Sequence, residues 1–264
     1  MSFTPDIFFF SKVSFEYSRY ARLVDYPETK CGRHNKPVFP DNFFNCLEKL
    51  EFDAACKRNI LIPSHVLLHL KNLKELNVHS SDAVEVIFDI EIEIKMKRII
   101  FCLKKLTLKY LPNLKCVWKK NLEGTINFPN LQEVVVNDCG SLVTLFSSSL
   151  ARNLEKLKTL EIEDCEKLVQ IVEKEDVMEK GMTIFVFPCL SFLTLWSMPV
   201  LSCFYPGKHH LECPLLNMLN VCHCPKLKLF TSNFDDGEKE EVMEAPISLL
   251  QQPLFSVEIL VTKH

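Results

Sequence analysis

The chain has 264 residues, of which 47% are hydrophobic and 25% charged, so it can bury a sizeable core. A formal net charge of −3 gives no reason to expect nucleic acid or an anionic membrane as the main partner. No apolar run reaches the roughly 18–20 residues needed to cross a bilayer, and the N-terminal "IFFF" is too short for a secretory signal. Twelve cysteines with no such signal, and no N-x-[ST] sequon, predict a reducing, cytoplasmic location.

Residues 1–38 hold no complete copy of any repeat, and we expect a spacer or a partial repeat there. From residue 39 a pattern L-x-x-L-x-L recurs, often continued by x-x-[CL]-x-x-L and an aromatic or aliphatic residue. The second apolar positions of the seven copies are Leu50, Leu76, Leu106, Val134, Leu160, Leu193 and Leu219. Successive positions lie 26 to 33 residues apart, close to the period of roughly 20–29 residues that is typical of leucine-rich repeats.

The core of each copy predicts a short strand whose leucines point inward while the intervening residues point outward. One coil alone leaves its apolar face exposed, so successive coils must stack and their strands pair in parallel. The predicted fold is therefore an α/β leucine-rich-repeat solenoid, with a concave parallel β-sheet and an irregular or short-helical convex side. We expect about seven repeats over residues 39–233, and residues 234–264 as an acidic loop followed by the start of an incomplete repeat.

Two segments predict short convex helices: "PSHVLLHLKNL" at 63–73, with Ser64 as its N-cap, and "SSSLARNLEKL" at 147–157. Elsewhere the return segments are punctuated by proline. The inserts at 89–98 and 173–182 account for longer spacings, and we expect them to form loops.

Two clusters suggest chemistry at first sight. The histidines and cysteines of "HHLECPLLNMLNVCHC" (209–224) lack zinc spacing, and Cys224 shares a repeat position with Cys139 and Cys165, which favours structural thiols over metal. The six lysines of 103–120 spread around a coil and predict a solvated face. No nucleophile, base and orienting group recur together, so we expect no enzyme and no cofactor.

Function in a solenoid of this kind lies on the outward residues of the concave strands. We expect partner-binding residues at Lys109, Tyr110, Val135, Asn137, Asp138, Glu161, Glu163, Asp164, Thr194, Trp196, Asn220 and His223. Trp196 is the most suggestive, because an outward tryptophan is costly unless something covers it; a return loop or a neighbouring side chain is the simplest cover. Acidic residues gather at 155–179 and lysines at 103–120, and this uneven charge favours oriented docking of a charged protein.

The sequence resembles the leucine-rich-repeat region of plant intracellular nucleotide-binding immune receptors, particularly the coiled-coil class of legumes, over roughly residues 39–260. The resemblance rests on "FPNL" (128–131), "FPCL" (187–190), "LPNLKCVW" (111–118) and the strand exits "NDCGSLVTLF", "EDCEKLVQIV" and "CHCPKLKLF". It implies a recognition module that senses a pathogen effector or a guarded host protein, or that holds a receptor inactive. The implied partner is a protein, not nucleic acid, membrane or a small molecule.

One departure from such receptors concerns their phosphate loop. The chain has six glycines, the nearest two being Gly124 and Gly140, so no G-x-x-x-x-G-K-[ST] motif is possible. We therefore expect a piece of a longer array or a truncated gene product. Three alternatives remain open: a substrate adaptor of a ubiquitin ligase, a truncated product with no independent role, and a metal- or nucleic-acid-binding protein.

Overall fold

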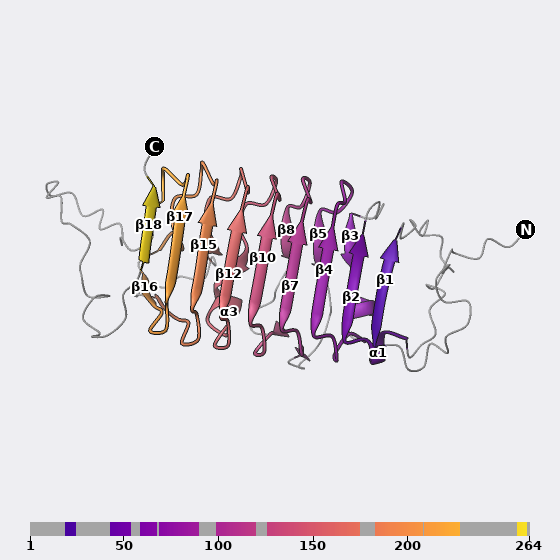
Figure 1. The fold of residues 1–264 in the computed structure, drawn as a ribbon. Helices are drawn as coiled ribbons and strands as arrows, with labels where there is room; N and C mark the ends of the chain where they lie inside the picture. The colour runs from indigo at the N-terminus through magenta and orange to yellow at the C-terminus, as the bar shows by residue number, and fades with distance from the viewer. Residues whose placement is uncertain are drawn as a thin grey trace, which may run out of the picture.

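A computed structural model describes residues 19–24, 43–53, 59–67, 69–89, 99–119, 126–174, 183–207, 209–227 and 258–262. The predicted loops at 89–98 and 173–182 and the predicted acidic loop after residue 233 lie almost wholly outside these residues. The described residues form a solenoid of stacked coils, with one long strand per coil on the same side (Figure 1).

Nine strands make one parallel sheet in the order β1-β2-β4-β7-β10-β12-β15-β17-β18. Their bounds are β1 Tyr20–Val24, β2 Lys49–Asp53, β4 Glu75–His79, β7 Lys105–Lys109, β10 Glu133–Asn137, β12 Thr159–Glu163, β15 Phe192–Trp196, β17 Met218–Cys222 and β18 Glu258–Thr262. Every neighbouring pair is parallel, and each strand matches the next residue for residue. The predicted fold and the predicted parallel pairing are confirmed.

The inward face of this sheet is apolar, as the alternation predicts. The second and fourth residues of each strand from β2 to β15 are buried, for example Leu160 and Ile162 of β12. Burial of such a side chain stabilises the fold by roughly 1.5–3 kcal/mol before the entropy of ordering is counted. The last predicted copy is less well covered, because its inward Leu216 and Val221 are only partly buried.

The sheet is longer than the seven predicted copies. β1 pairs with β2 inside the segment expected to be a spacer or a partial repeat, and β18 pairs with β17 inside the segment expected to hold an incomplete repeat. A strand can join such a sheet through backbone hydrogen bonds alone, which require no leucine pattern.

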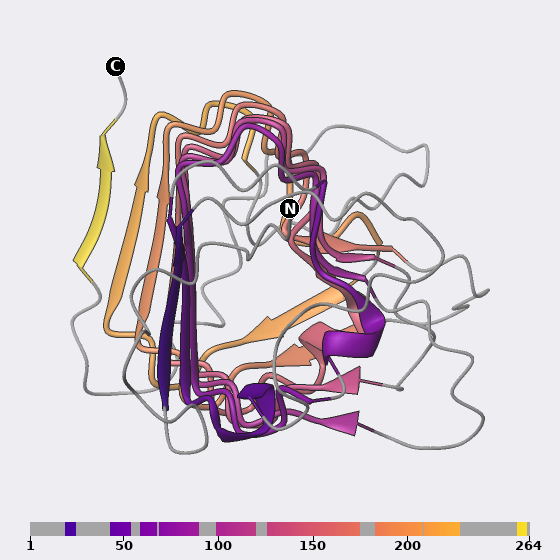
Figure 2. The same ribbon diagram turned by 90° about the vertical axis from the view of Figure 1, so that its right-hand side faces the viewer.

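The other sides of the coils carry short strands and single helical turns (Figure 2). The strands are β3 Ile60–Ile62, β5 Val86–Asp89, β6 Ile99–Ile100, β8 Cys116–Lys119, β9 Ile126–Asn127, β11 Phe146–Ser147, β13 Val172–Glu173, β14 Thr183–Val186 and β16 His209–Glu212. They form small parallel sheets of the orders β3-β5-β8, β6-β9, β11-β13 and β14-β16. The helices are α1 Phe43–Cys46, α2 Ser64–Leu67 and α3 Ser148–Ala151. These helices of the described residues are a single turn each, far too short to cross a membrane.

Both predicted convex helices are present. The Ser147 side chain caps α3 by accepting a hydrogen bond from the Leu150 amide at 3.3 Å. Helix α2 begins at Ser64 itself, one residue earlier than expected, and the amides of Val66 and Leu67 donate to the carbonyl of Pro63. The first amides of a helix have no partner within it, and here the carbonyl of the preceding proline accepts two of them.

Aromatic rings fill the core between the two sides. Trp118, expected at an inward position, is partly buried and stacks on Phe88 with ring centroids 4.7 Å apart. Phe128 packs against both rings. Further along the solenoid, Phe185 meets Phe204 edge-on at 5.7 Å. These ring contacts pack the short strands and return segments against one another within the core.

Candidate protein-recognition face

The concave face is formed by the outward side chains of the long strands. Because each strand matches the next in register, these side chains form three rows across the sheet. The first row is Lys49, Glu75, Lys105, Glu133, Thr159, Phe192 and Met218. The second row is Glu51, Asn77, Thr107, Val135, Glu161, Thr194 and Asn220. The third row is Asp53, His79, Lys109, Asn137, Glu163, Trp196 and Cys222.

A fourth row lies where the strands end. Its members share a left-handed backbone with φ between 51° and 57°: Ser80, Tyr110, Asp138, Asp164, Ser197 and His223. Their amides continue the ladder, and the Asp138 amide, for example, donates to the Glu163 carbonyl at 3.1 Å. Such a backbone turns the chain sharply and costs less at aspartate than at most other residues. Of the four predicted residues of this row, Tyr110, Asp138 and Asp164 follow one another at the rim, His223 lies beyond Ser197, and all four are exposed.

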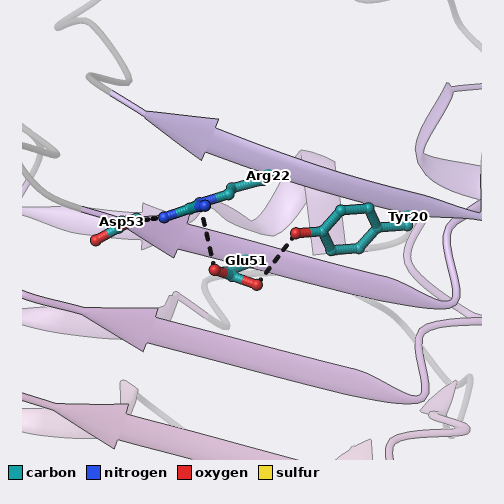
Figure 3. Close-up of polar contacts among 4 residues, drawn as sticks. All are labelled: Tyr20, Arg22, Glu51 and Asp53. Carbon is teal, nitrogen blue, oxygen red and sulfur yellow. Dashed lines mark hydrogen bonds and ion pairs between the residues drawn. The ribbon is translucent and has the colours of Figure 1, made fainter. Parts of the chain in front are cut away.

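At its N-terminal end the concave face carries charges that pair with each other (Figure 3). The Arg22 guanidinium contacts Glu51 at 3.3 Å and also pairs with Asp53, and the Tyr20 hydroxyl donates a hydrogen bond to Glu51 at 3.2 Å. The hydrogen bond to Asp53 raises the pKa of Arg22. Partial burial, together with the Glu51 carboxylate, raises the pKa of Tyr20. These four residues form the β1 latch, which ties the first strand to the second across the face.

The same pairing continues along the first row. Lys49 meets Glu75 at 3.3 Å, and Lys105 meets Glu133 at 2.6 Å. Lysine and glutamate thus alternate over four successive strands, and each cation has a carboxylate beside it. Exposed pairs of this kind add little stability, but they leave few charges here for a partner to neutralise.

The C-terminal end of the face differs in chemistry. Three large apolar side chains there are exposed: Phe192 by 44%, Trp196 by 40% and Met218 by 43%. Phe192 and Met218 are register partners, and Trp196 lies at the other end of the Phe192 strand. The Trp196 ring meets the His223 ring edge-on at 5.6 Å, yet two fifths of its surface stays open to solvent.

Carboxylates border this apolar surface. Trp196 is the register partner of Glu163, and Thr194 is the register partner of Glu161. Glu163 accepts a hydrogen bond from the Asn137 side chain at 2.9 Å. Within the described part of the chain, neither Glu161 nor Asp164 forms an ion pair. These carboxylates therefore keep their charge available to a bound partner.

Not every outward position offers surface. Val135, predicted to contact a partner, is only 7% exposed, and Thr107 and Cys222 in the same rows are also buried. Thr107 and Val135 are register partners in the interior of the second row, so each takes up part of the space beside the other. Lys109, Asn137, Thr194 and Asn220 stand in the second and third rows as expected and are half-buried.

Phe192, Met218, Tyr20 and Arg22 were missed by the sequence reasoning. The prediction assigned two outward residues to each strand, whereas each strand has three, and it gave residues 1–38 only as a spacer or a partial repeat. The signal for the first two was a bulky apolar residue directly before the inward leucine, in "FLTL" and "MLNV". The β1 latch left no local signal, because its partners are about thirty residues apart in the chain.

The cysteines at the shared repeat position line the strand exits. The thiols of Cys165 and Cys224 each lie 3.3 Å from a backbone carbonyl two residues earlier, and Cys139 contacts the Asn137 carbonyl at 3.6 Å. Burial raises the pKa of Cys139, and it raises that of Cys165 to about 12. These thiols act as small apolar groups with a weak donor.

The histidine and cysteine cluster at 209–224 is dispersed by the fold. His209 contacts the Gly207 carbonyl at 2.8 Å, Cys213 is buried, and Cys222 lies 3.2 Å from its neighbour His223. Among the residues that the structure describes, no three histidine, cysteine or acidic side chains converge as metal ligands would.

A family model described as "Plant disease resistance protein RPS2-like, leucine-rich repeats" matches residues 17–166, more than half of the chain. The chain belongs to this family. Comparison with curated proteins and with solved structures gave no match. The RPS2-like match begins just before β1 and ends just after β12, so it includes the self-paired charges. The apolar side chains of β15 and β17 lie beyond the matched residues.

Proposed function

We propose that this RPS2-like repeat region is a non-enzymatic recognition module of plant innate immunity whose concave face binds a protein. One observation carries the proposal: Phe192, Trp196 and Met218 are exposed together on a sheet face that is otherwise polar. Large apolar side chains gathered on a surface are typical of sites where another protein excludes water.

The architecture supports binding through a surface. Neighbouring strands of a sheet lie about 4.8 Å apart, so the rows form an array of side chains spaced at regular intervals and held by the core behind them. A rigid array loses little conformational entropy when a partner docks, which favours affinity. Three kinds of partner fit the family: a pathogen effector, a host protein under guard, or another domain of the same receptor. By the same resemblance, the receptor would be of the coiled-coil class and act in the cytoplasm.

Proximity labelling in leaf tissue tests the proposal. The full chain, fused to a biotin ligase, would be compared with the Trp196→Ala/Glu161→Lys variant. A matched control, Ile184→Thr/Glu155→Lys, removes an exposed apolar side chain from β14 and reverses one exposed charge away from the concave rows.

We expect at least one protein to be labelled by the natural chain and by the control, and to be lost with the concave-face variant. Equal labelling by all three chains would contradict the concave-face assignment. Circular dichroism of the purified variants would show that each of them is folded.

A further inference from the structure

The chemistry of the concave face specifies the partner more narrowly, and this step rests on the proposed function. We propose that β12, β15 and β17 bind an extended protein segment in which a lysine or arginine stands four residues from an aliphatic or aromatic side chain. We call the outward and strand-exit residues of these three strands, which lie within 159–164, 192–197 and 218–223, the docking quarter.

The apolar end of the docking quarter lies at the start of its strands. Phe192 and Met218 are register partners, and both are more than two fifths exposed. Thr159, on the other side of Phe192, is half-buried and short. An aliphatic or aromatic side chain laid between the Phe192 ring and the Met218 thioether would remove apolar surface from water on both sides, at roughly 25 cal/mol for each Å² buried.

The acidic end lies at the other end of the strands. Glu163 is the register partner of Trp196, Glu161 precedes it by two residues, and Asp164 follows it at the rim. A cation placed here would meet carboxylates on one side and could lie over the face of the Trp196 indole on the other. Carboxylates attract it by charge and hydrogen bonding, and the ring adds a cation–π contribution.

No cation of the docking quarter already occupies this place. Its outward and strand-exit positions carry three carboxylates, one histidine and no lysine or arginine. In the third row, Lys109 is separated from Glu163 by the strand that bears Asn137. At the N-terminal end of the face, by contrast, the carboxylates are already paired with Arg22, Lys49 and Lys105. The concave face therefore attracts a basic partner at one end, which also fixes the direction in which the partner lies.

The distance between the two ends sets the spacing in the partner. Phe192 and Trp196 are four residues apart on one strand, so their Cα atoms are separated by about 13 Å at roughly 3.3 Å per residue. An extended ligand lying along the strand covers the same distance in about four of its own residues. Thr194 and Asn220, half-buried and polar, lie between the two ends and face the intervening residues of the ligand.

Peptide selection tests this inference. A phage library of random twelve-residue peptides would be depleted on the Trp196→Ala/Glu161→Gln chain and then selected on the natural chain. We expect the enriched peptides to carry lysine or arginine four positions from leucine, isoleucine, phenylalanine or tryptophan. Enrichment of acidic or uncharged peptides would overturn the proposal, and so would the absence of any enrichment after depletion.

Fluorescence anisotropy on synthetic versions of the enriched peptides measures each contribution. We expect Trp196→Ala to weaken binding at least about tenfold, as for a hot-spot residue. Met218→Gln and Glu161→Gln should each weaken it several-fold, and raising NaCl from 50 to 300 mM should do the same because it screens the carboxylates. The controls Ile184→Thr and Glu155→Gln should bind as the natural chain does. Equal affinities for a basic peptide and its glutamine-substituted copy would overturn the inference.

The two proposals fail in different ways. If proximity labelling depends on the concave face while the selected peptides lack a basic residue, the partner chemistry is wrong and the recognition function stands. If labelling does not depend on the concave face, the function itself is wrong, whatever peptides are selected.

Discussion

The two ends of the concave face share one backbone and differ in the chemistry of their outward side chains. Strands β1 to β10 present lysines, arginine and glutamates that pair with one another, whereas β15 and β17 present exposed apolar side chains next to unpaired carboxylates. The strands match in register across the sheet, and the strand exits from β4 to β17 share the same left-handed backbone. A repeat fold therefore keeps its architecture with the inward residues and changes its surface with the outward ones, nearly independently.

The family match follows the same division. It covers the strands with self-paired charges and ends before the strands with exposed apolar side chains. The shared family features thus identify the fold and the biological setting, while the exposed apolar side chains of β15 and β17 that we propose to contact a partner lie outside the matched residues.

The largest expected effect is the loss of stability on truncating an inward residue, and it should be similar at both ends of the concave face. Leu76→Ala and Leu193→Ala each empty a fully buried position of the sheet, so each should lower the free energy of unfolding by about 2–5 kcal/mol. The neighbouring outward changes Asn77→Ala and Thr194→Ala should cost far less, because both side chains are partly solvated. Urea unfolding followed by circular dichroism measures all four. A Thr194→Ala cost as large as that of Leu193→Ala would contradict the inward and outward assignment.

A second comparison concerns the strand exits, which are left-handed at both ends. Valine at Ser80 or at Asp164 forces a β-branched side chain into that conformation, and each change should cost about 1–2 kcal/mol of stability. Glycine at the same positions adopts it without strain and should leave the unfolding midpoint nearly unchanged. If Asp164→Val and Asp164→Gly unfold at the same urea concentration, the left-handed exit is wrong.

The buried thiols should make the stability of some repeats depend on pH, because other repeats have no cysteine at this position. Burial raises the pKa of Cys165 from 9.0 to about 12, so the folded chain keeps this proton after the unfolded chain has lost it. The contribution of the protonated Cys165 thiol to stability is complete below pH 9 and is lost as the pH rises toward 12. The expected loss is about 1.4 kcal/mol per pH unit in this window.

Urea midpoints measured between pH 8 and 10.5 test the thiol effect. Cys165→Ala should lower stability at pH 8 because it leaves a small cavity, and it should flatten the alkaline slope relative to the natural chain. Met198 occupies the equivalent position of the next copy, so Met198→Ala serves as a control that loses stability and keeps the slope. An unchanged slope in Cys165→Ala would show that this thiol is not shielded from water.

The smallest expected effect is at the β1 latch. Arg22→Ala removes the contacts to Glu51 and Asp53 across the first two strands. Because these charges are exposed, we expect amide exchange in β1 to rise only about two- to fivefold, with no change in β15. Hydrogen-exchange mass spectrometry measures both strands, and 0.5 M NaCl should bring the natural chain close to the variant. A larger change in β15 than in β1 would contradict a local latch.

Much of the fold could be predicted from the repeat. The period predicted seven of the nine long strands, their inward leucines and the structural thiols. It could do so because an apolar residue of a stacked coil is shielded from water only when it faces the core. It also placed Trp196 outward. It gave only a spacer or partial repeat and an incomplete repeat where β1 and β18 join the sheet, and it predicted Val135 to contact a partner although this side chain is buried.

What the sequence by itself determined is which side of each strand faces the core, since alternation within a strand is a local property of the backbone. Only the tertiary structure decided which outward side chains meet. Register brings Arg22 to Asp53, Phe192 to Met218 and Glu163 to Trp196, although each pair is separated by more than twenty residues of chain. The spacing between copies varies from 26 to 33 residues, so these contacts between neighbouring strands cannot be predicted from spacing alone and follow only from the stacked coils.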